Sequence, residues 1–296
     1  MTYFKIHDIM TPSTEQNLNI KPTKHKTMSN NIALSNETLA KNTPAIFERR
    51  TVAKASDRYN HINTDELIDA LRQRDWHVTK AFQRKMNNPF SAHTVACTHG
   101  SFINGDTFVQ DDCVPQIVII NSHNRMVPLT ITCGVFRIIC SNGLIVKSED
   151  FGETKFKHFR CHSIETVLSA VEEAAKRLGD ISETINEFKS IKLNEKQLRQ
   201  YADNVYKIRV NSKIDEYKLS SIDTLNLLTP RRIEDSGTSL WNVFNVAQEN
   251  CIRGGVDFKT KGMRVLREIK NPVRDWNINT ELWEMTDNFR RELITA

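Results

Sequence analysis

The sequence has no long apolar segment and no clustered cysteines. Its longest run of large apolar residues is the four-residue stretch from Ile117 to Ile120, whereas a membrane-spanning helix needs about 20 such residues. The first ten residues include Lys5 and Asp8 and no apolar core of a secretion signal. The six cysteines form no CxxC pair, which disfavours a zinc ribbon or a thioredoxin-type site. We therefore expect reduced cysteines, a cytoplasmic location and no membrane association.

The sequence also lacks the common catalytic motifs. It contains no GxxxxGK[ST] phosphate loop, no GxGxxG turn, no HExxH helix and no GxSxG elbow. Adjacent acidic pairs such as Asp111-Asp112 point their side chains apart in regular structure, so they rarely form one metal site. A possible mixed zinc cluster has no favourable spacing; its members are Cys97, His99, Cys113 and His123. We therefore expect no metal and no cofactor, and the sequence favours a non-enzymatic protein.

The composition is that of a folded protein with a mild positive charge. The 296 residues are 39% apolar and 26% charged, and the formal net charge is +5, far below that of a polybasic tail. Residues 1–50 are rich in Asn, Thr, Ser and Lys and have little apolar periodicity. We expect them to form a mobile tail, which is either a basic arm for anionic partners or a solvated leader. Residues 51–296 are expected to form a single domain.

Residues 51–160 carry the signals of β structure. Trp76–Gln83 and the β-branched stretch Gln116–Ser122 are predicted strands. A short connection leads to a strand from Val127 to Ile139, in which four apolar residues share one face; they are Leu129, Ile131, Cys133 and Val135. Gly134 suggests a bulge or a close backbone approach, and Ser141-Asn142-Gly143 a tight turn.

Residues 161–296 show the 3.6-residue period of helices. A helix capped by Ser163 is expected to end at Gly179, and a capping box joins Asn194 to Gln197 at the start of another. Further helices are predicted over Ser239–Arg253 and from about Thr280 to Leu293. An earlier helix is expected to begin with Thr64 as its N-cap. A strand-rich first half followed by a helical second half predicts an α+β fold.

One predicted helix carries an unusual number of polar residues on its apolar side. On the 239–253 helix, Asn245 and Gln248 fall between apolar residues and should be half-buried, where an amide needs hydrogen-bond partners. They either tie loops to the helix or face a ligand or a nucleic-acid base. Trp241 and Phe244 on the same helix are candidates for stacking on bases.

The best candidate for a nucleic-acid-binding surface lies around and after this helix. Arg231 and Arg232 either form an internal ion-pair network with Glu234 and Asp235 or contact phosphate through the guanidinium fork. A basic stretch follows, in which clustered cations are typical of nucleic-acid contact or of a solvated face. The candidates are Arg253, Lys259, Lys261, Arg264 and Arg267, and Lys270 completes the stretch.

Four ordered segments resemble a phage- and plasmid-borne family, the phage/plasmid-like proteins of domain of unknown function 932. They are Ser56-Asp57-Arg58-Tyr59 with the helix after Thr64, then Asn121-Ser122-His123, then Gly134 to Gly143 with Lys157-His158, and finally Arg231 to Gly255. The resemblance implies a mobile-element origin and a cytoplasmic setting in a bacterial host, and it brings no established activity. His123-Asn124 departs from the His-Asp pair of the family pattern.

The family-like polar residues form a second candidate site. Its members are His123, Arg137, Asn142 and His158. Arg137 is suited to pair with an acid or to reach an anion. His123, at the tip of a hairpin, is either a catalytic base or a turn histidine with a structural hydrogen bond.

These observations leave two main hypotheses about function. The first is an accessory protein that binds nucleic acid, preferentially single-stranded DNA, during replication or recombination of a phage or plasmid. The alternative is an effector that binds and inhibits a host or defence protein, which needs no catalytic motif. A third reading is an enzyme whose site combines scattered acids with His123 or His158. Homo-oligomerisation is compatible with all three.

Overall fold

The computed structural model describes residues 33–49, 62–103, 113–137, 142–145, 153–158, 162–210, 222–257 and 265–295. The strands are β1 (Trp76–Gln83), β2 (His93–His99), β3 (Cys113–Asn121), β4 (Leu129–Arg137), β5 (Asn142–Ile145) and β6 (Thr154–Phe156). The α-helices are α2 (Asn36–Asn42), α3 (Thr64–Arg72), α4 (Gly100–Ile103), α5 (Ile164–Lys176), α6 (Leu178–Ser190), α7 (Glu195–Val210), α9 (Leu240–Arg253) and α10 (Pro272–Thr295). The 3₁₀ helices are η1 (Pro44–Phe47), η2 (Thr224–Leu228) and η3 (Ile233–Asp235). The predicted α+β fold, with a strand-rich first half followed by a helical second half, is confirmed.

The strands form one antiparallel sheet in the order β1-β2-β3-β4-β5. β6 pairs with the first residues of β4 and β5 pairs with the last ones, so both continue the sheet beyond β4. Pro115 has no N–H to donate, and it lies in the part of β3 beyond the last β2 pair, Cys97 with Ile117. The sheet therefore accommodates this proline without losing a hydrogen bond of the ladder to β2.

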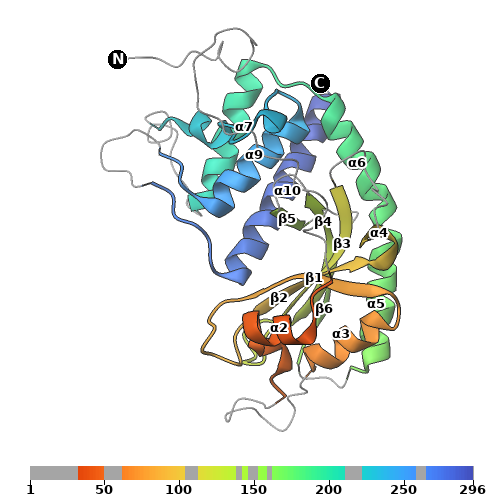
Figure 1. Ribbon diagram of the computed structural model, residues 1–296. Helices are drawn as coiled ribbons and strands as arrows, with labels where there is room; N and C mark the ends of the chain where they lie inside the picture. The colour runs from red at the N-terminus through yellow and green to blue at the C-terminus, as the bar shows by residue number, and fades with distance from the viewer. Residues whose placement is uncertain are drawn as a thin grey trace.

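One face of the sheet builds the main core with α3 and α5. Val78, Cys97, Ile119 and Cys133 are almost fully buried there, and the Cys133 thiol lies 3.1 Å from the carbonyl oxygen of Ala174 in α5. The predicted apolar face of β4 is thus confirmed. Figure 1 shows α5 and α6 following one another along one side of the molecule, while α7, α9 and α10 pack together beyond the other face of the sheet.

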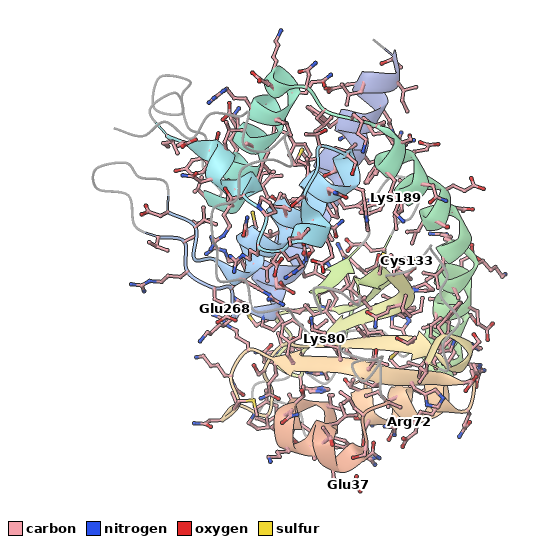
Figure 2. All side chains as sticks on the ribbon, turned by 45° about the horizontal axis from the view of Figure 1, so that its top comes forward. Glu37, Arg72, Lys80, Cys133, Lys189 and Glu268 are labelled. Atoms are coloured by element: carbon pink, nitrogen blue, oxygen red, sulfur yellow. The ribbon has the colours of Figure 1, made fainter. Side chains whose placement is uncertain are left out.

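The second face of the sheet meets the start of α10. Trp276 packs against Ala96, Val118 and Ile120, and Figure 1 shows this end of α10 reaching the sheet near β2. Polar residues share this face and bond to one another: the side-chain amide of Gln116 donates to the hydroxyls of Thr79 and Thr98 at 2.9 and 3.0 Å. Figure 2 shows Lys80 on the side of the strands that faces α7, α9 and α10, and Arg72 of α3 on the opposite side.

Local capping explains where several helices begin and end. The hydroxyls of Ser163 and Ser239 accept backbone N–H bonds at the starts of α5 and α9. At α7, Gln197 Oε1 accepts from the Asn194 N–H and Asn194 Oδ1 accepts from the Gln197 N–H, at 2.8 and 3.0 Å, so the predicted capping box is confirmed. α9 ends at Gly254, whose φ of 67° favours glycine.

Residues 33–49 differ from the expected tail. They form α2 and η1, and Leu39 and Ile46 are buried in the main core. The Leu34 N–H donates to the Val78 carbonyl and the Ala45 N–H donates to Gln83 Oε1, at 2.7 and 2.8 Å. The low apolar content of the segment hid these contacts, because two buried side chains are enough to anchor it. The rest of the expected tail, residues 1–32 and residue 50, lies outside the described residues.

Several expected boundaries also differ. The β3–β4 register runs without interruption through Gly134, opposite Gln116, so there is no bulge at this position. Asn142 and Gly143 are part of β5 rather than a turn. α3 is capped by Asn63, one residue before Thr64, and Gly179 lies inside α6. α10 begins at Pro272, eight residues before the expected start, since proline suits the first turn of a helix.

Candidate functional site

The paired arginines before α9 are engaged within the chain. Arg231 Nε donates to Asn250 Oδ1 at 2.7 Å, and the same guanidinium donates to the Gly254 carbonyl. Arg232 donates to Asp235 Oδ2 and Glu249 Oε1, at 3.0 and 2.6 Å. These are the contacts of an internal network, as in the first of the two interpretations above, but Glu249 is a partner in place of Glu234. Arg253 adds a third cation to this network, 3.0 Å from Glu249.

The two amides on α9 also bond within the chain. Asn245 Nδ2 donates to the Trp241 carbonyl one turn earlier, at 2.7 Å. Gln248 Nε2 donates to Asn279 Oδ1 at 2.8 Å and so ties α9 to α10. Asn279 in turn donates to the Asp275 carbonyl at 2.9 Å. The two amides therefore hold the helical layer together, and in this arrangement they do not present their donors to an external ligand.

Trp241 and Phe244 lie in the core. Their exposed fractions are 3% and 1%, and the rings pack on each other and, through Phe244, on Phe188 and Trp283. A ring that is covered on both faces cannot stack on a base. The expectation that these two residues stack on nucleic acid is therefore wrong, because their helical spacing marked a core stripe and not a surface.

A segment that we call the strap, residues 265–271, crosses the end of α9 just before α10. Its backbone is fixed to α9 and the turn that follows: the Leu266 N–H donates to the Val256 carbonyl at 3.0 Å and the Ile269 N–H to the Ile252 carbonyl at 2.8 Å. Gly254 makes the crossing possible, since a Cβ there would lie 2.5 Å from the Leu266 carbonyl oxygen. The strap is thus a rigid platform and not a free loop.

A buried arginine binds the backbone of the strap from the side of α7. Arg209 of α7 is 6% exposed, and its Nη2 donates to the Arg267 carbonyl at 2.6 Å while its Nε donates to the Cys251 carbonyl at 2.9 Å. Two carbonyls therefore compensate the cost of burying this cation. Arg209 was not among the predicted site residues, because its partners are backbone carbonyls and no pattern in the sequence indicates such contacts.

The strap turns Leu266 and Ile269 inward and its charged side chains outward, while Val265 at its start is 49% exposed. Leu266 and Ile269 pack against the main core, whereas the side chains of Arg267 and Lys270 are exposed, as is that of Arg274 in the first turn of α10. The acidic exception is Glu268, 3.5 Å from Lys270, and both side chains are largely exposed, so this pair contributes little. Lys259, Lys261 and Arg264 lie outside the described residues.

The second candidate site is a buried polar network at one end of the sheet. Thr64 Oγ1 lies 2.9 Å from His93 Nε2 and 3.0 Å from Asn121 Nδ2. The rings of His93 and His123 are 5.1 Å apart, and both residues are fully buried. His158 Nε2 lies 3.1 Å from the Val127 carbonyl, so the fold brings His123 and His158 to the two ends of the same β3–β4 connection.

The hydrogen bonds define the proton positions on two of these rings. His93 Nδ1 faces the Ser91 carbonyl at 3.1 Å, and a carbonyl only accepts, so Nδ1 carries the proton. In the neutral ring Nε2 then accepts from the Thr64 hydroxyl, whose oxygen accepts from Asn121. His158 Nε2 must likewise be protonated toward Val127. The network therefore fixes the two loops at this end of the sheet, and His93 and His158 each donate one ring N–H to a backbone carbonyl.

Arg137 and Asn142 occupy facing positions, since they pair across the β4–β5 ladder. They lie at the other end of β4 from His123, so the structure does not gather the four family-like residues into one site. The side chains of Arg137 and Asn142 are not among those described. His123 and His158 remain together at the β3–β4 connection.

Titratable groups elsewhere give little support for nucleophilic chemistry. Burial raises the pKa of Cys97, Cys133 and Cys251 to about 12, so these thiols stay protonated at neutral pH. Within the described parts of the chain, no group of three or more His, Cys, Asp or Glu residues is placed to hold a metal ion. Burial also raises the pKa of Asp275 to about 6, although Lys80 and the Asn279 hydrogen bond lower it. Asp275, at the junction of α10 and β1, is a perturbed group that sequence analysis missed.

Comparison with known families now adds to this geometry. A family profile described as Domain of unknown function (DUF932) matches residues 52–283, which include both candidate sites. The chain belongs to the DUF932 family. This DUF932 protein is similar to the UPF0380 proteins YfjQ and YafZ of Escherichia coli strain K12, each 26% identical over 266 residues that cover 88% of this chain and 93% of the relative. No solved structure matches it. None of the helices that the structure describes is long and apolar enough to cross a membrane.

Proposed function

We propose that this DUF932 protein is a non-enzymatic accessory that binds nucleic acid, with a preference for single-stranded DNA. It acts in replication or recombination of a phage or plasmid, in the cytoplasm of a bacterial host. The observation that supports the proposal is the strap, which holds Arg267 and Lys270 outward on a backbone fixed to α9. Arg274 extends the basic surface into α10, although its Nη2 also donates to the Arg209 carbonyl at 3.2 Å.

A fixed basic surface suits a polyanion. Cations on a rigid backbone lose little conformational freedom when they meet phosphates, so more of the electrostatic gain remains as affinity. Each phosphate that is neutralised releases condensed counterions, and this makes binding dependent on salt. In contrast, the side chains of Arg231, Arg232 and Arg209 already have internal partners, so we assign no phosphate contacts to them.

The test is fluorescence anisotropy of the purified protein with labelled single-stranded and duplex DNA over a salt series. We expect salt-sensitive binding that is tighter for the single strand. Charge reversal at Lys259, Lys261, Arg264 and Arg267 should weaken it and lower the slope of log affinity against log salt by about 3, because each phosphate contact on a single strand adds about 0.7.

Glu268→Gln is the matched control on the same strap. It removes an acid beside Lys270, so it should leave binding unchanged or strengthen it. Absence of binding at low salt by a correctly folded protein would refute the proposal. The alternative, an effector that binds and inhibits a host or defence protein, would then be tested by isolating a stable complex with a host partner.

A further inference from the structure

The loops at one end of the sheet present a second basic surface that the sequence did not single out. The connections β1–β2 (84–92) and β3–β4 (122–128) leave the same end, because the register aligns Gln83 with His93 and His93 with Asn121. The ring contact between His93 and His123 joins them underneath. We call the outer face of these two loops the sheet-end surface.

The sheet-end surface combines exposed cations with exposed apolar side chains. Arg84, Lys85 and Arg125 are exposed, and Met86 and Met126 are 50% and 78% exposed. Neither loop contains an Asp or Glu. Cations beside flexible apolar side chains fit a ligand that offers both phosphates and unpaired base faces, as a single strand does and a duplex does not.

Both loops are held in place by their own hydrogen bonds. Asn88 Oδ1 accepts from the Phe90 N–H and Asn124 Oδ1 from the Met126 N–H, at 3.0 and 3.1 Å. The Ser122 hydroxyl and Val127 bond to each other twice, at 2.9 and 3.1 Å. Arg125, at the tip, adopts a φ of 66°, a conformation that costs energy for a residue other than glycine. The hydrogen bonds of the β3–β4 loop hold the backbone of Arg125 in this conformation and so fix the direction in which its side chain leaves the loop.

The sheet-end surface continues into the strap. Val127, at the end of the β3–β4 loop, and Val273, in the first turn of α10, pack against the same small cluster that contains Trp276. The strap ends at Asn271, directly before α10. Figure 1 shows the start of α10 and the loop between β1 and β2 on the same side of the molecule, and Figure 2 shows the strap residue Glu268 on this side as well.

We propose that one single-stranded nucleic acid binds both surfaces, running from the strap across the start of α10 to the sheet-end surface. This inference rests on the proposed function and names the path of its ligand. Phosphates contact Arg84, Lys85 and Arg125, and bases pack on Met86 and Met126. The two methionines thus provide the base contacts that the sequence suggested for Trp241 and Phe244, whose rings are buried.

The test compares a triple variant, Arg84→Gln with Lys85→Gln and Arg125→Asn, with the wild-type protein. Asparagine tolerates the positive φ at position 125. Binding is measured by anisotropy with oligothymidylates of about 6 and about 18 nucleotides, which span the usual range of site sizes. We expect the salt slope for the long oligonucleotide to fall by about 2, at about 0.7 per contact. The affinity gain of the long oligonucleotide over the short one should also disappear.

The matched control removes three cations from α7 and the residues before it, through Lys192→Gln, Lys196→Gln and Arg199→Gln. These side chains are exposed, and the same net charge is lost, so any effect of overall charge is equal. A separate variant, Met86→Ser with Met126→Ser, should weaken binding while the salt slope stays unchanged.

The outcomes separate the two proposals. If wild-type protein binds, and strap variants weaken binding while the triple variant behaves like its control, the path is refuted and the proposed function stands. If the wild-type protein binds neither oligonucleotide at low salt, both are refuted. If the salt slope falls in the triple variant and not in its matched control, the result supports the path.

Discussion

Glu249 is a carboxylate that is 2% exposed and is held by two arginines from different parts of the chain. Arg232 lies 2.6 Å away and Arg253 lies 3.0 Å away. The carboxylate thus connects Arg232, directly before η3, to α9, and its removal would take one of two carboxylates from this guanidinium, which also pairs with Asp235. Single residues of this kind determine which arginines are available to a ligand.

Glu249→Gln tests this network at the level of one atom. The amide keeps the shape but loses the negative charge, so we expect the free energy of unfolding to fall by roughly 2–3 kcal/mol. Urea denaturation measures it. Glu268→Gln, on the exposed strap, should change it by less than about 0.5 kcal/mol. Equal effects of the two substitutions would contradict a structural role for Glu249.

The sequence alone could not identify the partners of these arginines. Asp235 is a partner of Arg232, as its closeness in sequence suggests. Glu249, in contrast, lies 17 positions beyond Arg232 and meets it only through the fold. The same limit applies to Trp241 and Phe244, whose spacing is equally compatible with a surface stripe or a core stripe. Burial depends on what packs against a helix, and Phe188 and Trp283 come from distant segments.

At the scale of elements, caps and periodicity were reliable where the chain carries local signals. Ser163 and the Asn194–Gln197 pair cap helices as predicted, and Ser239, predicted as the first residue of its helix, is the N-cap of α9. Sequence analysis missed β2, because its inward and outward positions mix threonine and histidine with apolar residues. These polar side chains serve the network around His93 and Gln116, so a tertiary requirement outweighed the usual alternation.

The N-caps of α7 and α3 offer a matched comparison. Asn194 accepts a backbone N–H at 3.0 Å, whereas Asn63 makes no side-chain cap bond. We expect Asn194→Ala to lower the free energy of unfolding by about 1 kcal/mol, and Asn63→Ala to lower it less. Thermal and urea unfolding of both variants would check this. A larger loss for Asn63→Ala would show that its side chain has another role.

At the scale of the whole molecule, α10 joins the two halves. It packs against α7, α9 and β5, while Trp276 and Val273 meet the sheet. Asp275 lies at this junction, where burial raises its pKa to about 6. Its charge therefore affects the contact between sheet and helices and the overall stability of the protein.

The pH dependence follows from the direction of this shift. An aspartate in the unfolded chain titrates near about 3.9, so the folded protein binds this proton more tightly. The contribution of Asp275 to stability is most favourable below about pH 4, falls as the pH rises to about 6 and is constant above that. Asp275→Asn should therefore be more stable than wild type at about pH 7.5, by up to about 2 kcal/mol, and equally stable near pH 4.

Urea unfolding over this pH range tests the expectation, with Asp223→Asn as an exposed control. This control removes one negative charge at an exposed position and so measures the effect of net charge alone. If Asp275→Asn is less stable than wild type at neutral pH, the attraction between Asp275 and Lys80 outweighs the cost of burial.

The position of α10 has a consequence during synthesis on the ribosome. Ala96, Val118 and Ile120 are complete early, but their cover, Trp276, is made about 180 residues after Ala96. At about 5–20 residues per second, this apolar side of the sheet waits roughly 10–35 s for its partner. The nascent chain thus carries this side of the sheet uncovered until α10 has been made, and a stop codon before α10 would leave it so permanently.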